Sequence, residues 1–195
     1  MQILKINQKK FKETVKTTVK ALKEGKIIIC PTDTVYGLIC DAANKKAVQK
    51  IFKIKKRPKT KPIPIFVKDL NQAKKIARID KKQENFLKRV WPGKVTAVLR
   101  RKKIKIYGVA KNNIALRIPR YFLIDELARK INRPLAETSV NVSNQPPITR
   151  INKIIGHFKG KRLQPDLIID IGDLPEKKPS VVLDLTTFPP KVLRG

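Results

Sequence analysis

Hydrophobic residues along the chain follow two different spacings. Residues 27–30 form a continuous apolar run, which is typical of a buried strand. Between residues 11 and 22, and again between 47 and 54, apolar side chains recur every three or four positions, which predicts amphipathic helices. Asn7 is suited to cap the first of these helices, and Gly25 is expected to end it. Pro31 follows the apolar run and should end that strand, since proline offers no backbone N–H.

The same two patterns continue to the end of the chain. Further strands are expected at residues 3–6, 63–67, 96–99, 114–118, 134–137, 167–169 and 181–183, and further helices at 71–77, 82–90, 121–131 and 150–158. Pro64 predicts that 63–67 is an edge or irregular strand. Because strands and helices alternate and several connections are short, we expect one α/β domain over residues 1–195, a twisted open mixed sheet flanked by helices.

Composition excludes two broad classes of protein. Hydrophobic residues make up 41% of the chain and charged residues 31%, which argues against a disordered chain, and no apolar run reaches membrane-spanning length. The N-terminus shows no secretory signal, so we expect a cytoplasmic protein with no membrane contact. Cys30 and Cys40 both adjoin apolar residues and are expected to be reduced. With two Cys and one His, we expect no metal site.

Charge narrows the choice of partner only in part. The chain holds 46 Lys and Arg against 15 Asp and Glu, a net charge of +31, and such a field attracts polyanions. ATP and RNA are both polyanions, so charge alone cannot separate a nucleotide enzyme from an RNA-binding protein. The lysines are spread along the predicted helices, which favours a solvated surface over a dedicated RNA groove.

Cations and hydroxyl groups dominate the candidate chemistry. Polar residues follow two predicted strands, at 32–34 and 138–141, and the ends of strands in open α/β sheets often bind ligands. Lys55 and Arg57 end a helix before Pro58, and Arg117 lies in an apolar strand. No Walker loop and no Ser-His-Asp arrangement is visible in the sequence. Such residues suit phosphate handling by positioning and charge stabilisation.

Each of these candidates also has a simpler interpretation. Lys55 and Arg57 belong to a basic run, 53–61, that could be solvated surface. A buried arginine needs a carboxylate or a ligand, so Arg117 could form a structural ion pair or face water from an edge strand. Thr149 could cap the following helix instead of contacting a ligand.

Several motifs together resemble one known family. They are Pro-Thr-Asp-Thr-Val-Tyr-Gly-Leu at 31–38, Lys-Lys-Arg-Pro at 55–58, Lys-Pro at 61–62, Trp-Pro-Gly-Lys-Val-Thr at 91–96, Ser-Val-Asn at 139–141, Pro-Ser-Val-Val at 179–182 and Val-Leu-Arg-Gly at 192–195. In order and spacing they resemble the YrdC-like family, the threonylcarbamoyl-AMP synthases, over nearly the whole chain. The resemblance implies a YrdC-like fold with a concave basic face. Some members of the family carry an extra C-terminal domain, for which we expect no room in this chain.

The resemblance also implies a role for individual residues. It implies that L-threonine is held by Thr34, Phe66, Arg117, Ser139 and Ser180. It implies that ATP is bound by Lys55, Arg57, Lys61, Asn113, Asn141, Thr149 and Arg194. Lys55 and Arg57 would be the catalytic cations, and Mg²⁺ would enter with ATP, without protein ligands.

The chain departs from the family pattern at a few positions. Lys56 stands where a glycine is common between the two cations. Ser143-Asn144 stands in place of Ser-Gly, and asparagine is the residue after glycine that best tolerates a positive φ. Val181 replaces a threonine and removes one hydroxyl group.

A specific reaction is implied by the resemblance. L-threonine, bicarbonate and ATP would give threonylcarbamoyl-AMP and pyrophosphate, and a downstream threonylcarbamoyl transferase complex would use the product to modify tRNA to N6-threonylcarbamoyladenosine. The alternative from another class is a module of the same fold that binds double-stranded or ribosomal RNA without synthase activity. A third interpretation, a carbamoyl-adenylate enzyme of metal-centre maturation, usually involves a longer chain with zinc motifs.

Overall fold

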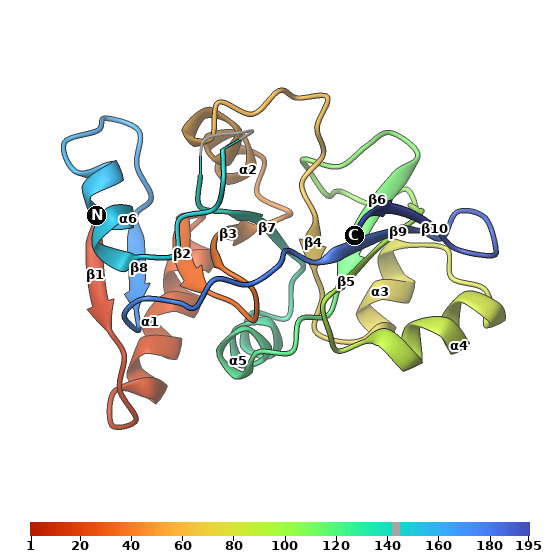
Figure 1. Cartoon of the computed structure of the whole chain (residues 1–195), viewed down its shortest axis with the longest axis horizontal. Helices are drawn as coiled ribbons and strands as arrows, with labels where there is room; N and C mark the ends of the chain where they lie inside the picture. The colour runs from red at the N-terminus through yellow and green to blue at the C-terminus, as the bar shows by residue number, and fades with distance from the viewer. Residues whose placement is uncertain (142–144) are drawn as a thin grey trace.

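Residues 1–141 and 145–195 are described by the computed structural model, and ten strands in these residues join one sheet (Figure 1). The strands are β1 Gln2–Lys5, β2 Ile28–Pro31, β3 Tyr36–Asp41, β4 Ile65–Phe66, β5 Val95–Arg100, β6 Asn113–Arg117, β7 Leu135–Ser139, β8 Leu167–Asp170, β9 Val181–Asp184 and β10 Lys191–Arg194. The helices are α1 Phe11–Lys23, α2 Lys45–Ile54, α3 Leu70–Ile76, α4 Lys81–Val90, α5 Phe122–Ile131 and α6 Ile151–Phe158.

The sheet is mixed, as the sequence predicted. Its strand order is β1-β8-β2-β3-β7-β4-β6-β5-β9-β10. The β2/β3, β3/β7, β4/β7, β5/β6 and β9/β10 pairs are antiparallel, whereas β1/β8, β2/β8, β4/β6 and β5/β9 are parallel. The middle of the sheet is therefore built from strands that lie far apart in the sequence.

Two hydrophobic cores lie on opposite faces of the sheet. Successive side chains of a strand point to opposite faces, and in β2 Ile29 belongs to one core whereas Ile28 and Cys30 belong to the other. The first core includes residues of α2, α3, α4 and α6, and the second includes residues of α1 and α5. Cys30 and Cys40 are both buried free thiols, as expected from their apolar neighbours.

Two strands, β3 and β10, were not predicted. Residues 32–35, which follow the first predicted buried strand, are the turn of a β2–β3 hairpin. The last strand, β10, pairs with β9 at one edge of the sheet. The strand after Pro64, β4, was expected to be an edge or irregular strand; it is irregular, with only two residues, and it lies inside the sheet between β7 and β6.

Helix caps agree with the sequence in some places and differ in others. Asn44 and Asp69 cap α2 and α3 by accepting backbone N–H groups at 3.0 and 2.6 Å. Asn7 instead accepts the N–H of Lys10 in a turn before α1. The cap expected of Thr149 is wrong: α6 begins after Arg150, and the distant Asp173 carboxylate accepts the N–H of Ile151 at 2.8 Å.

A tight C-terminal cap ends α2 and sets the positions of Lys55 and Arg57. The Lys56 N–H donates to Lys53 O at 3.1 Å, and the Arg57 N–H donates to Phe52 O at 2.9 Å. This is the Schellman pattern, in which the residue after the C-cap takes a left-handed conformation. Lys56 has a φ of 49°, so the glycine preference at this position has a backbone cause.

Replacement of Lys56 by glycine should raise the free energy of unfolding by about 0.5–1 kcal/mol, since a left-handed φ costs a lysine more than a glycine. Urea denaturation monitored by circular dichroism measures the change. Lys53→Gly is the matched control and should lower the free energy by about 1 kcal/mol, because it puts glycine inside the helix. A loss of stability in both variants would contradict the cap geometry.

The connection from β8 to β9, residues 171–180, crosses the molecule from one half of the sheet to the other (Figure 1). Its start is held by Tyr36, whose hydroxyl donates to Gly172 O at 2.7 Å and accepts the Ile171 N–H at 3.2 Å. Its end carries Ser180 to the start of β9. Among the described residues, no helix is long and apolar enough to span a bilayer.

Candidate active site

A buried ion pair joins the first polar segment to the middle of the sheet. Arg117, the last residue of β6, is only 3% exposed, and Asp33 in the β2–β3 turn is 8% exposed. Nη2 of Arg117 donates to both Asp33 carboxylate oxygens at 2.8 and 2.7 Å, and Nε donates to Gly93 O at 2.9 Å. The structural ion pair considered for Arg117 is therefore present, and its partner is in the Thr-Asp-Thr motif.

The two threonines of that motif hold the turn in place. The Thr32 hydroxyl accepts the N–H groups of Thr34 and Val35 at 3.1 and 3.2 Å and donates to Val35 O at 2.7 Å. Thr34 is buried, and its hydroxyl lies 3.1 Å from that of Thr32. Asp33 also accepts the Arg120 N–H at 3.2 Å. The turn thus aims Asp33 at Arg117 and fixes Thr34 beside it in the chain.

Lys55 fastens a second motif, the Ser-Val-Asn segment that follows β7. Its ammonium donates to Ser139 O at 2.5 Å, to Asn141 O at 2.9 Å and to Asn141 Oδ1 at 2.7 Å. The Ser139 hydroxyl donates to the same Oδ1 at 2.7 Å. Lys55 is 2% exposed, and burial, with the nearby Arg57 charge, lowers its pKa to about 8. The chain itself thus accepts all three Lys55 N–H donors.

Arg57 points in a different direction from Lys55. Its Nε donates to Lys61 O at 2.9 Å and its Nη2 to Pro62 O at 2.8 Å, and partial burial lowers its pKa. The residue lines a hollow of about 670 Å³ together with apolar side chains that include Phe52 and Tyr107. A cation beside aromatic and aliphatic surface suits a ligand with a phosphate and a planar base.

Ser180 and Arg194 meet at the other side of the site. Arg194 Nη2 donates to Ser180 O at 2.8 Å and to Ser180 Oγ at 3.2 Å. The buried Ser180 hydroxyl also lies 3.0 Å from that of Thr96 on β5. The serine expected to hold threonine and the arginine expected near phosphates are therefore in direct contact, although 14 residues separate them in sequence.

Phe66 packs under the arginine of the ion pair. It is a buried residue of the second core, and its ring centroid lies 5.7 Å from the Arg117 guanidinium carbon. It sits directly opposite Arg117 in the β4/β6 register and opposite Leu135 in β7. An aromatic face under a guanidinium stabilises its charge and limits its rotation, so Phe66 positions Arg117.

A carboxyl group that the sequence did not mark lies among these residues. Glu137 is in β7, two residues before Ser139, so both side chains point to the same face of the sheet. Burial raises its pKa to about 7, against the opposing effect of the Arg117 and Lys55 charges. The sequence marked Glu137 only by its position in the predicted strand 134–137, directly before the second polar segment, 138–141.

Some predicted residues are not brought to this cluster. Asn113 begins β6, four residues before Arg117, which in a strand is about 13 Å away. Thr149 precedes α6, and its carbonyl accepts the Leu174 N–H at 3.1 Å. Lys61 is different: its side chain is exposed in the connection after α2, but its carbonyl accepts the Arg57 Nε hydrogen bond at 2.9 Å, so it stays beside Arg57. Ser143 and Asn144 lie outside the described residues.

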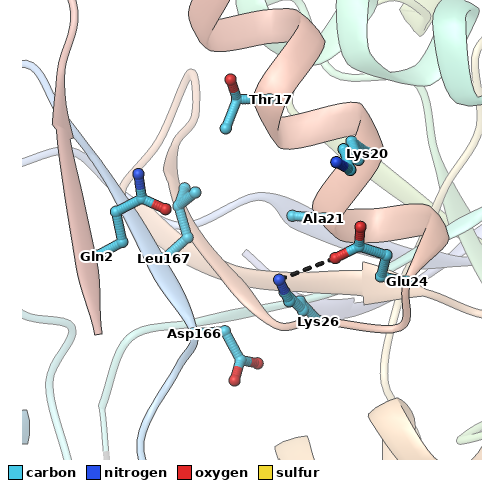
Figure 2. Close-up of a pocket in the computed structure, with 8 residues that line it drawn as sticks. All are labelled: Gln2, Thr17, Lys20, Ala21, Glu24, Lys26, Asp166 and Leu167. Atoms are coloured by element: carbon cyan, nitrogen blue, oxygen red, sulfur yellow. Dashed lines mark ion pairs between the residues drawn. The ribbon is translucent and has the colours of Figure 1, made fainter.

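The hollow between the end of α1 and the start of β8 is a different feature (Figure 2). It has a volume of about 400 Å³ and is lined by Gln2, Thr17, Lys20, Ala21, Glu24, Lys26, Asp166 and Leu167. A Lys26–Glu24 ion pair of 2.8 Å bounds it. Its residues, all in the described part of the chain, include none predicted for the site. Within residues 1–141 and 145–195, no group of three or more His, Cys, Asp or Glu could hold a metal ion.

Comparison with known proteins accounts for this arrangement. The model of the Sua5_yciO_yrdC family, described as telomere recombination, matches residues 20–195. The chain belongs to the Sua5/YciO/YrdC family. It is 34% identical to a Methanocaldococcus jannaschii protein over 185 residues, which are 95% of this chain and 86% of that protein. The resemblance seen in the motifs is thereby confirmed.

Further relatives are named for an activity. The chain is 34% identical to the threonylcarbamoyl-AMP synthase of Pyrococcus abyssi over 89% of its own length, but it spans about half of that protein, 51%. It is 29% identical to the threonylcarbamoyl-AMP synthase of Vibrio vulnificus over 87% of its length and 92% of the relative.

Solved structures share the same fold. The crystal structure of P. abyssi Sua5 complexed with L-threonine matches 99% of this chain and 56% of its own, with a TM-score of 0.86 and 32% identity. The structure of Escherichia coli YciO matches 99% of this chain with a TM-score of 0.85 at 24% identity, a likeness of fold. The predicted YrdC-like fold is therefore confirmed.

Proposed function

We propose that this protein is an L-threonylcarbamoyladenylate synthase. The observation that carries the proposal is the match, over 99% of the chain, to a structure that holds L-threonine. Named synthases at 34% and 29% identity support it. Motifs that suggested this activity also contact one another in pairs: Asp33 with Arg117, Lys55 with Asn141, and Ser180 with Thr96.

Threonine would bind beside the buried ion pair. Arg117 uses Nε and Nη2 for Gly93 and Asp33, and within residues 1–141 and 145–195 its Nη1 makes no hydrogen bond. A substrate carboxylate oxygen can take that donor in a charge-assisted bond. The Thr34 hydroxyl in the Thr-Asp-Thr motif, the Ser139 hydroxyl in the Ser-Val-Asn motif and the Ser180 hydroxyl would be further contacts for threonine. Asp33 keeps the guanidinium in place, because its carboxylate binds Nη2 and leaves Nη1 for the substrate.

ATP would bind where the cations of the site lie. The threonine amine and bicarbonate give a carbamate and water; a carbamate oxygen then attacks the α-phosphorus, and pyrophosphate leaves. Both reacting groups are anionic, so Arg57 and Arg194 would reduce their repulsion and stabilise charge on the leaving group. Lys55 would hold Ser139 and Asn141 in place before the nucleotide binds, because these two residues accept all three of its N–H donors.

Mg²⁺ would enter with the nucleotide, since phosphate oxygens are its usual ligands in such reactions. Threonylcarbamoyl-AMP is a mixed anhydride and must be consumed by a transferase, which we expect to be the complex that makes N6-threonylcarbamoyladenosine in tRNA. A hollow of about 770 Å³ along the end of β5 and the β5–β6 connection offers a basic surface for RNA, lined by Arg78, Arg100, Arg101, Lys102, Lys103, Lys105 and Lys111.

Calorimetric titration of L-threonine in the presence of ATP tests the proposal. Threonine should bind at least about tenfold more tightly than L-alanine, because a site built around hydroxyl partners rejects a ligand without a hydroxyl group. Ser180→Ala should remove most of this preference, whereas Thr186→Ala, at a hydroxyl that bonds only Asp184 nearby, should not. Release of pyrophosphate only with threonine, bicarbonate and ATP together completes the test.

Equal affinity for threonine and alanine in folded wild-type protein would contradict the synthase proposal. RNA affinity that falls steeply with salt and survives Ser180→Ala would then favour the RNA-binding alternative.

A further inference from the structure

One carboxyl group in the active site finds no partner among the residues that the structure describes. Within the described residues, 1–141 and 145–195, the Glu137 side chain makes no hydrogen bond and no ion pair. The chain holds 46 basic residues and 15 acidic ones, and among the described residues eight of the acidic side chains form ion pairs. A half-buried carboxyl group that remains unpaired in such a chain requires an explanation.

The room for this carboxyl group is made by Gly37 on the neighbouring strand. A Cβ at residue 37 would lie 2.5 Å from Glu137 Oε1, so the carboxyl group rests against bare backbone of β3. Gly37 pairs with Ser139, and Ile39 pairs with Glu137. The Glu137 N–H donates to Pro64 O at 3.0 Å. The strand is therefore fixed on both sides, and the side chain stands on the site's face next to Ser139.

The nearest cations are not its counter-ions. Arg117 directs Nη2 at Asp33 and Nε at Gly93 O, and Lys55 spends its three N–H donors on Ser139 and Asn141. Arg194 donates to Ser180. All three positive charges still favour the ionised form of Glu137. The site thus holds a negative group that its own cations do not neutralise by contact, beside residues proposed to bind threonine.

We propose that the Glu137 carboxylate binds the α-ammonium group of the amino-acid substrate. L-threonine carries a carboxylate, an ammonium and a hydroxyl group, and the site offers Nη1 of Arg117 for the first and hydroxyl side chains for the third. Glu137 supplies the missing partner, a charge-assisted acceptor for the N–H donors. The inference rests on the proposed function and names a residue that determines specificity within that site.

Electrostatics agree with this role. Burial raises the Glu137 pKa to about 7, and the negative charge of Asp33 acts in the same direction, against Arg117, Lys55 and Arg194. Burial raises the pKa of the Cys30 thiol, and the Glu137 charge acts in the same direction. A bound ammonium group would favour the ionised carboxylate, so ligand binding relieves the cost of burying its charge.

The test compares L-threonine with its α-hydroxy analogue, in which a hydroxyl group replaces the amine. Calorimetry at pH 8 with ATP present gives the ratio of the two affinities. Wild-type protein should prefer threonine, and Glu137→Gln should reduce that ratio at least about tenfold, because an amide oxygen attracts an ammonium group far less than a carboxylate does. Gln has the same shape as Glu, so binding of the α-hydroxy analogue should change little.

Two further variants make the result specific. Gly37→Ala displaces the carboxyl group without removing its charge and should also reduce the ratio. Glu13→Gln, at an exposed carboxylate in the first turn of α1, should leave it unchanged. An unchanged ratio in Glu137→Gln, in protein that binds threonine, would overturn this inference alone. Wild-type protein that binds no threonine would overturn both the inference and the proposed function.

Discussion

Replacement of Asp33 by alanine is expected to lower the free energy of unfolding by about 3–5 kcal/mol, because it leaves a buried guanidinium without its counter-ion. Arg117 is 3% exposed and directs Nη2 at both Asp33 oxygens. The variant also removes the acceptor of the Arg120 N–H, a second link between the β2–β3 turn and the segment after β6. Urea denaturation at neutral pH, followed by tryptophan fluorescence and circular dichroism, measures the change.

The chain contains a suitable control for this prediction. Asp125 and Arg129 form an exposed pair on α5 with two contacts of 2.9 Å. Asp125→Ala should cost less than about 1 kcal/mol, since exposed ion pairs stabilise little. The double variant Asp33→Ala with Arg117→Met should recover part of the loss, because it removes the unpaired charge. Equal small losses for Asp33→Ala and Asp125→Ala would contradict the importance given to the buried pair.

The second large effect concerns pH. Burial raises the Glu137 pKa from 4.5 to about 7 in the folded protein, so between these values the folded state binds more protons than the unfolded state. Stability should therefore fall as pH rises from about 4.5 to 7, with a contribution from Glu137 of up to about 3 kcal/mol. Glutamine cannot ionise, so Glu137→Gln should not show this loss of stability and should be more stable than wild type at pH 7.5.

The measurement is urea denaturation of wild type, Glu137→Gln and Glu13→Gln at pH 5 and pH 7.5. The difference between wild type and Glu137→Gln should grow with pH, whereas Glu13→Gln should follow wild type. Lys55 does not contribute to the pH dependence in this range, because its pKa is lowered to about 8 and it stays protonated in both states below that pH. Between about pH 8 and 10.5 the unfolded state binds more protons, so the contribution of Lys55 should make stability rise with pH there. If the free energy of unfolding changes with pH by the same amount in wild type and Glu137→Gln, the pKa of Glu137 is not raised in the folded protein.

The sequence predicted much of the site because several of its features are local. The Lys55–Arg57 corner follows from the end of α2, and Ser139 and Asn141 follow one short strand. These are properties of adjacent residues, and caps, strand ends and proline positions can be seen in sequence. The part of the resemblance that joins separate motifs was confirmed by the family match, but the roles of the individual residues stay predictions.

Partners within the site could not be predicted in the same way. Asp33 and Arg117 are 84 residues apart, and Lys55 and Asn141 are 86 apart. The sequence showed that a buried arginine needs a partner, yet several carboxylates could have supplied it. Glu137 gave even less signal, because the room that it occupies exists only where β7 lies beside Gly37 of β3.

The sequence by itself determined the α/β class, most helices and strands, the cationic corner and the family, because each depends on periodicity, on local caps or on motifs in order. Only the tertiary structure decided that β4 is central, that residues 32–35 are a hairpin turn and that β10 brings Arg194 to Ser180. Such features depend on which strands become neighbours. Pairing of strands is selected by the burial of whole faces of the sheet, a long-range free energy that no single segment of the chain contains.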